Sequence, residues 1–141
     1  MFRITLIQNY INKYGYSRYL EIGTFKGESL FPIVCKKKIA VDPKFIFTNV
    51  NKIKWIFKNP SNIRNSYFQL ESDSFFSLEK INLQSNKVDI VFIDGMHTFK
   101  ASLKDALNSL EVLNDNGIII LHDCLPPHKA ASDPAKSYDE A

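Results

Sequence analysis

Two short, almost entirely apolar runs with a helical pattern between them are the feature that most constrains the fold. Residues 88–93 and 118–121 are rich in Val and Ile, as expected of strands whose two faces are both covered. Between them, large apolar residues recur at helical spacing, with Thr98 suited to be the N-cap and Asn116-Gly117 the stop. The residues on this helical face are Phe99, Leu103, Ala106, Leu107, Leu110 and Leu113. This pattern favours a parallel sheet with helices on both faces.

The first half of the chain shows the same alternation of strands and helices. Strands are predicted at residues 18–22, 38–41 and 66–71, and helices at residues 4–14, 28–35, 53–57 and 75–81. Gly15 is suited to end the first helix, Pro32 to kink or shorten the second, and Pro60 to stop the third. We therefore predict an α/β fold with a doubly wound, mainly parallel, five-stranded sheet.

Length and composition agree with one globular domain. The chain has 141 residues, of which 45% are hydrophobic and 23% charged, and this balance suits a packed core. We predict a folded domain over residues 1–125. Residues 126–141, where prolines and small residues replace large apolar ones, are predicted to form a polar tail.

Charge and cysteine content argue against several classes of function. The net charge of +3 is spread along the chain. The one dense basic run, residues 36–38, is interpreted as a solvated turn, because the Arg and aromatic clustering of a nucleic-acid-binding face is missing. Cys35 and Cys124 are too few for a disulfide framework or a four-ligand zinc site. Without a membrane-spanning run or a signal-peptide pattern, we expect a soluble cytoplasmic protein that binds neither nucleic acid nor membrane.

Polar residues collect where the predicted strands end. Ligands of an open parallel sheet bind beyond the carboxyl ends of its strands. The polar residues at these ends are Glu21, Asp42, Asp73, Asp94, His97, His122 and Asp123. Acids in such places also cap helices or form turns, but polar groups at five strand ends together favour a binding site.

The turn at residues 23–27 differs from the dinucleotide-binding fingerprint. In G-x-G-x-x-G the second and third glycines would stand where this chain has Phe25 and Glu28, which disfavours an NAD-dependent oxidoreductase. The glycines present, Gly23 and Gly27, suit a ligand that has a nucleoside but no diphosphate. Asp42 follows Gly23 by about 20 residues, where a carboxylate can accept hydrogen bonds from ribose hydroxyls.

Several stretches resemble the Rossmann-like S-adenosylmethionine-dependent methyltransferases, in particular the methyltransferase domain 24 type. Their first motif is similar to Tyr19-Leu20-Glu21-Ile22-Gly23-Thr24-Phe25-Lys26-Gly27, and their ribose-binding motif is similar to Val41-Asp42-Pro43. The most specific pieces are Phe92-Ile93-Asp94-Gly95-Met96-His97 and Leu121-His122-Asp123. The resemblance covers about residues 17–127.

The resemblance implies S-adenosylmethionine as the cofactor and suggests which residues bind it. The residues that would contact it around its methionine part are Glu21, Gly23 and Gly27, with Thr24 in the same turn. Asp42 would hold the ribose, Ser72 and Asp73 would lie near the adenine, and Asp94 would also bind the cofactor. The implied reaction is methyl transfer to a hydroxyl group of a small molecule or sugar.

The resemblance also raises the question of a metal. In related O-methyltransferases, acids after the fourth and fifth strands hold a magnesium ion, and Asp94 and Asp123 match those positions. His122 stands where an acid or amide is usual, and a histidine favours softer metals. In the alternative interpretation, Asp94 caps the following helix or binds the cofactor, and His122-Asp123 closes the floor of the site.

His97 is the predicted proton acceptor, with Asp94 as the second catalytic residue. It lies at the start of a predicted helix, and imidazole has a pKa suited to taking the proton of a substrate hydroxyl. The positive end of the helix would keep the ring neutral and able to act as a base. A structural role, with the ring donating to a backbone carbonyl, is the alternative.

The resembled fold usually has two further strands, and none is visible after Asp123. We therefore expect the chain to be a fragment of a longer domain, with an exposed sheet edge at the fifth strand. Such an edge favours association between copies of the chain. The alternative function is that of a non-catalytic or partial methyltransferase fold acting as an interaction module.

Overall fold

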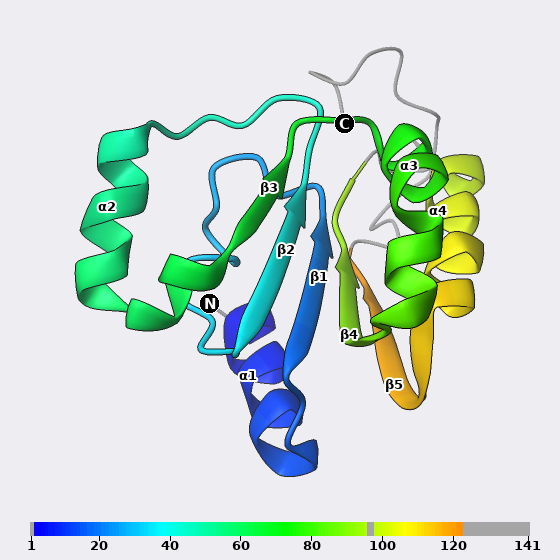
Figure 1. The fold of residues 1–141 in the computed structure, drawn as a ribbon, viewed down its shortest axis with the longest axis horizontal. Helices are drawn as coiled ribbons and strands as arrows, with labels where there is room; N and C mark the ends of the chain where they lie inside the picture. Colours follow the sequence, from blue (N-terminus) through cyan, green and yellow to red (C-terminus); the bar gives the residue numbers. More distant parts are fainter. Residues whose placement is uncertain (1, 96–97, 123–141) are drawn as a thin grey trace.

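The fold is built around one parallel β-sheet. The computed structural model describes residues 2–95 and 98–122, and in them five parallel strands lie in the order β3-β2-β1-β4-β5 (Figure 1). The strands are β1 (Arg18–Ile22), β2 (Lys37–Val41), β3 (Ser66–Phe68), β4 (Val88–Ile93) and β5 (Leu113–Leu121). The helices are α1 (Phe2–Tyr14), α2 (Asn49–Lys58), the 3-10 helix η1 (Pro60–Arg64), α3 (Ser72–Ser85) and α4 (Phe99–Val112). The predicted α/β fold is confirmed.

The alternation of side chains along each strand divides the core into two halves. Leu20 and Ile22 of β1 belong to one buried cluster, together with Phe75 of α3 and Val112 of α4. Tyr19, the neighbour of Leu20, belongs to the other cluster, in which Ile7 and Ile11 of α1 are buried. Helices therefore cover both faces of the sheet, as predicted, with α3 and α4 side by side on one face (Figure 1).

The chain reverses its direction of winding between β1 and β4. It passes from β1 to β2 and β3 at one edge, then crosses back to β4, which pairs with β1 on its other side. Ile22 is opposite Val41 on one side and Ile93 on the other, so these three strands end at the same level. A doubly wound sheet binds its ligands at such a switch point.

The helix predicted at residues 28–35 is wrong. The segment forms turns, with Phe31 N–H bonded to the Gly27 carbonyl as in a single helical turn. Pro32 cannot continue a helical hydrogen-bond ladder. The carbonyls of Leu30 and Ile33 accept instead from side chains of the later segments 37–41 and 59–62.

Lys38 is the second correction, because residues 36–38 are not simply a solvated turn. The Lys38 side chain is fully buried, and its Nζ donates to the Leu30 carbonyl, the Ile33 carbonyl and Asn62 Oδ1. These three acceptors match the three donors of an ammonium group. Lys38 therefore ties the turn segment to η1 from within β2.

The orientation of α4 is the third correction. Its predicted N-cap is confirmed, since Thr98 Oγ1 accepts from the Ala101 N–H. Its predicted core face is confirmed for Ala106 and Leu113, which pack against the core, but is wrong for the other four residues. The side that packs on the sheet carries Asp105, Ser109 and Val112, and the exposed side carries Phe99, Leu103, Leu107 and Leu110.

Other predicted elements differ only at their ends. The third strand ends at Phe68, three residues earlier than predicted, and β5 begins at Leu113 and is irregular opposite residues 88–90. Within the described residues, β5 is an edge of the sheet, as expected. The predicted tail over residues 126–141 lies outside the described residues. No helix in the described part of the chain is both long and apolar enough to cross a membrane.

Candidate functional site

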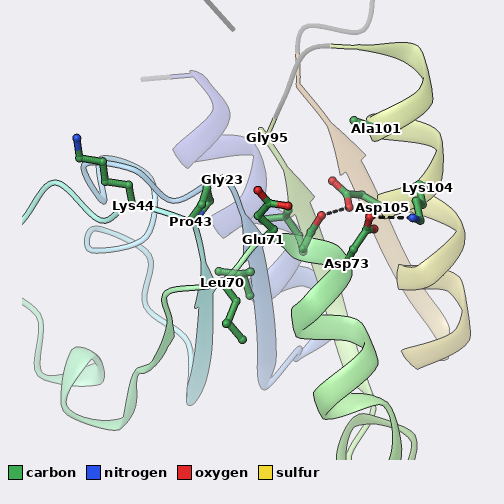
Figure 2. A pocket seen from close by; sticks show the side chains of 13 residues that line it. Gly23, Pro43, Lys44, Leu70, Glu71, Asp73, Gly95, Ala101, Lys104 and Asp105 are labelled. Carbon is green, nitrogen blue, oxygen red and sulfur yellow. Dashed lines mark hydrogen bonds and ion pairs between the residues drawn. The ribbon is translucent and has the colours of Figure 1, made fainter. Parts of the chain in front are cut away.

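A cavity of about 440 Å³ opens at the carboxyl ends of β1, β2 and β4 (Figure 2). Its apolar walls are Ile22, Val41, Pro43, Leu70 and Ala101. Its charged side chains are Lys44, Glu71, Asp73, Lys104 and Asp105. Gly23, Gly95 and Ser72 complete the lining. The cavity thus lies on the face of the sheet covered by α3 and α4, beside the switch point.

The turn after β1 is shaped by its two glycines. Gly23 and Gly27 have φ of +88° and +75°, in the left-handed region that favours glycine. A Cβ on Gly23 would stand 2.1 Å from the Asp94 carbonyl oxygen, and one on Gly27 would stand 2.4 Å from the Phe31 ring. Both glycines are therefore required by the packing of the chain itself, and Gly23 in addition lines the cavity.

Thr24 lies in the same turn and is almost fully buried. Its Oγ1 is a buried polar atom for which no described residue provides a hydrogen-bond partner. Such an atom is uncommon in a native fold and asks for an explanation. A ligand at the turn is one, although Thr24 does not belong to the cavity lining described above.

Asp42 holds the turn in place from the end of β2. Its Oδ2 accepts from the Phe25 N–H at 2.9 Å, and its Oδ1 accepts from the Lys44 N–H at 2.8 Å. The side chain is fully buried and does not line the cavity. The structure shows the hydrogen bonds of Asp42 to the backbone of the turn. Its contact with ribose stays a prediction.

Glu21 is also buried outside the cavity. It lies beside Tyr19, whose hydroxyl donates to Glu21 Oε2 at 2.6 Å. Burial raises the pKa of the Glu21 carboxyl to about 8, against the effect of the Tyr19 hydrogen bond, which lowers it. Like Asp42, Glu21 lies in the buried interior at the end of its strand and does not line the cavity.

The loop between β3 and α3, together with the first residues of α3, forms another wall of the cavity. Ser72 Oγ, at the start of α3, donates to Asp105 Oδ1 of α4. On the outer side, Lys104 Nζ is bonded to Asp73 Oδ2 at 2.7 Å (Figure 2). The two contacts join the first turn of α3 to α4, and the predicted site residues Ser72 and Asp73 both line the cavity.

Asp105 is the lining residue that the sequence analysis missed most clearly. It is 5% exposed, and burial raises the pKa of its carboxyl. The spacing of apolar residues predicted that another side of α4 faces the core, so Asp105 was not identified as a site residue. The available signal was the stripe Ala101, Asp105 and Ser109, whose small or polar side chains recur every four residues. No sequence motif or spacing marked Lys44, Glu71 and Lys104 as site residues.

Asp94 and His122 meet at the ends of β4 and β5. His122 Nδ1 lies 2.9 Å from Asp94 Oδ1, and both side chains are partly buried. Backbone bonds from Asp94 N–H to Ile22 and from His122 N–H to Ile93 align these ends. The pair adjoins Gly95 of the cavity lining, so the ends of β4 and β5 bring these two predicted site residues together.

The described residues do not support the predicted metal site. Among residues 2–95 and 98–122, no cluster of three or more His, Cys, Asp and Glu side chains is arranged to hold a metal ion. Asp94 and His122 supply one carboxylate and one imidazole already in contact with each other, whereas Mg²⁺ prefers oxygen ligands. The third predicted ligand, Asp123, and the predicted base, His97, lie outside the described residues.

Two comparisons relate the chain to known proteins. A family model described as a methyltransferase domain matches residues 20–124, which contain the last three residues of β1, all of β2 through β5 and the cavity lining. The chain is also similar to an uncharacterized protein, R132, of Acanthamoeba polyphaga mimivirus, with 29% identity over 116 residues. This match covers 74% of the chain and 50% of the viral protein, so the chain spans about half the length of that relative.

Proposed function

The chain belongs to the methyltransferase domain family, and on this premise we propose that it binds S-adenosylmethionine in the cavity and transfers a methyl group to a hydroxyl of a small molecule or sugar. The observation that carries the proposal is the place of the cavity, at the switch point of the sheet and within the matched residues. Its volume of about 440 Å³ falls in the usual range of small-molecule sites.

The residues present fit such a cofactor. Apolar side chains of Ile22, Val41 and Leu70 suit the faces of a planar base. The Glu71 and Asp73 carboxylates line the same cavity and are acceptors suited to ribose hydroxyls. Asp42 would act on the cofactor indirectly, by holding the turn through Phe25.

The bound cofactor would supply an electrophilic methyl group, and the task of the protein would be positioning. The Asp94–His122 pair adjoins the cavity at the strand ends, and the carboxylate fixes the orientation of the imidazole ring. An acceptor hydroxyl held there would lose its proton to a histidine, His97 in the sequence prediction. No step in this scheme requires a metal.

Binding of S-adenosylhomocysteine, measured by isothermal calorimetry on the 141-residue chain, tests the cofactor assignment. The variant Ala101→Phe places a ring in the cavity and should weaken binding at least about tenfold, because an overfilled site excludes the ligand. Substitutions of Gly23 or Asp42 are poorer probes, since both would disturb the turn itself.

Leu103→Phe, on the exposed side of the same helix, is the matched control and should bind as the parent does. If the folded parent chain shows no heat of binding, the cofactor assignment fails, and the interaction-module alternative gains support. Methyl transfer from isotopically labelled cofactor to a panel of hydroxylated small molecules then tests the acceptor class.

A further inference from the structure

Asp105 places a buried carboxylate in the lining of the cavity. It lies on the side of α4 that faces the sheet, between Ala101 and Ser109 on the same helical stripe. Figure 2 shows its carboxylate pointing from α4 towards the ends of the strands. A charged group in this position is costly unless its oxygens receive hydrogen bonds.

Only one of the two oxygens is satisfied by the described residues. Ser72 donates to Oδ1, and no hydrogen bond from residues 2–95 or 98–122 reaches Oδ2. Lys104, the neighbouring cation, is paired with Asp73 on the outer side. Oδ2 therefore keeps its capacity to accept a hydrogen bond inside the cavity.

The surroundings of Oδ2 select the kind of donor. A Cβ on Gly95 would stand 3.7 Å from Asp105 Oδ2 and 3.8 Å from Ile22 Cγ2, so a carboxylate oxygen and an apolar side chain flank the same space. An ammonium group would need several acceptors there and would lose its hydration. An amino group on the edge of a planar heterocycle needs one acceptor at its edge and apolar contacts on its faces.

We propose that Asp105 is the specificity-determining residue for the adenine base, with Oδ2 accepting a hydrogen bond from the exocyclic amino group. The inference rests on the proposed function and adds that Asp105 Oδ2 is the atom that distinguishes adenine from other bases. Ser72 is then a positioning residue, because it fixes the carboxylate through Oδ1. A base with a carbonyl oxygen in place of the amino group would face the carboxylate with a second acceptor and be rejected.

The test compares S-adenosylhomocysteine with S-inosylhomocysteine in calorimetric titrations of the 141-residue chain. The inosyl compound carries a carbonyl oxygen in place of the amino group and a proton on the neighbouring ring nitrogen. The parent should prefer the adenosyl compound at least about tenfold, because a hydrogen bond to a charged group is lost and an acceptor pair is created. In Asp105→Asn the preference should shrink towards one, because an amide can donate to the carbonyl as well as accept from the amine.

Glu111→Gln makes the same change of carboxylate to amide on α4, outside the cavity, and should keep the parent's preference. A parent that binds both compounds equally overturns the inference without any variant. So does an Asp105→Asn protein that binds both more weakly at an unchanged ratio, since Asp105 is then only structural. If neither compound binds to the folded parent, the proposed function itself fails, which is a different outcome.

Discussion

Glu21 and Lys38, two of the buried ionisable residues, show what single residues do in this fold. Strand alternation places both on the α1 side of the sheet, away from the cavity. Sequence patterns predicted the strands that carry them but not their partners. Glu21 accepts a hydrogen bond from Tyr19, two residues away, whereas the acceptors of Lys38 come from the turns after β1 and from η1. Such long-range partners leave no local pattern in a single sequence.

Glu21 should make the stability of the protein depend on pH. Burial raises its pKa to about 8 in the folded state, so the folded chain keeps a proton that the unfolded chain releases above its ordinary value of 4.5. The free energy of unfolding should then fall as the pH rises from 5 to 7, by about 1 kcal/mol per pH unit. Above pH 7 the effect of Lys38, whose pKa burial lowers to about 7, has the opposite sign.

Urea unfolding at pH 5, 6 and 7 measures this slope. Glu21→Gln keeps the shape and an acceptor for the Tyr19 hydroxyl, and should remove about 1 kcal/mol per pH unit from it. Glu28→Gln, a change of an exposed carboxylate, should leave the slope as it is. Equal slopes in the parent and Glu21→Gln would show that Glu21 is ionised in the folded protein.

At the scale of elements, the helix α4 shows that sequence periodicity can predict where a helix lies in the chain without predicting which of its sides packs on the sheet. The sequence predicted its start at Thr98 from capping chemistry, and its length from the apolar spacing. Its predicted orientation was wrong because most of the large apolar side chains of the stripe lie on the exposed side. The packed side instead uses the small or polar stripe that includes Asp105 and Ser109, with partners in Ser72 and in the helix backbone.

The orientation of α4 can be tested by comparing two truncations to alanine. Val112→Ala, on the buried side, should lower the free energy of unfolding by about 1–3 kcal/mol, because it leaves a cavity in the core. Leu107→Ala removes a larger side chain, but from the exposed side, and should change it by less than about 0.5 kcal/mol. Denaturant unfolding decides, and a larger loss for Leu107→Ala would mean that α4 is turned the other way.

At the scale of the whole molecule, the sheet was more predictable than the site. The strand β4 and residues 118–121 of β5 are marked by nearly continuous apolar runs, and their parallel order follows from the helix between them. The cavity draws on strand ends, one loop and one helix face, and most of its charged residues are individually unremarkable. Gly23 and Asp73 were predicted because they follow strand ends, and Ser72 was predicted from the family resemblance, whereas Asp105 depends on how α4 is rotated.

Because the cavity draws on β1, β2, β4, α4 and the loop before α3, a ligand in it should stabilise the fold as one unit. At a concentration 100 times its dissociation constant, S-adenosylhomocysteine should add about 2.7 kcal/mol to the free energy of unfolding. For a domain of this size that raises Tm by about 5–10 °C. Thermal unfolding followed by circular dichroism measures the shift, and Ala101→Phe should lack it. Calorimetric binding without a change in Tm would mean that the cavity elements open independently of the rest of the sheet, against the continuous parallel pairing from β3 to β5.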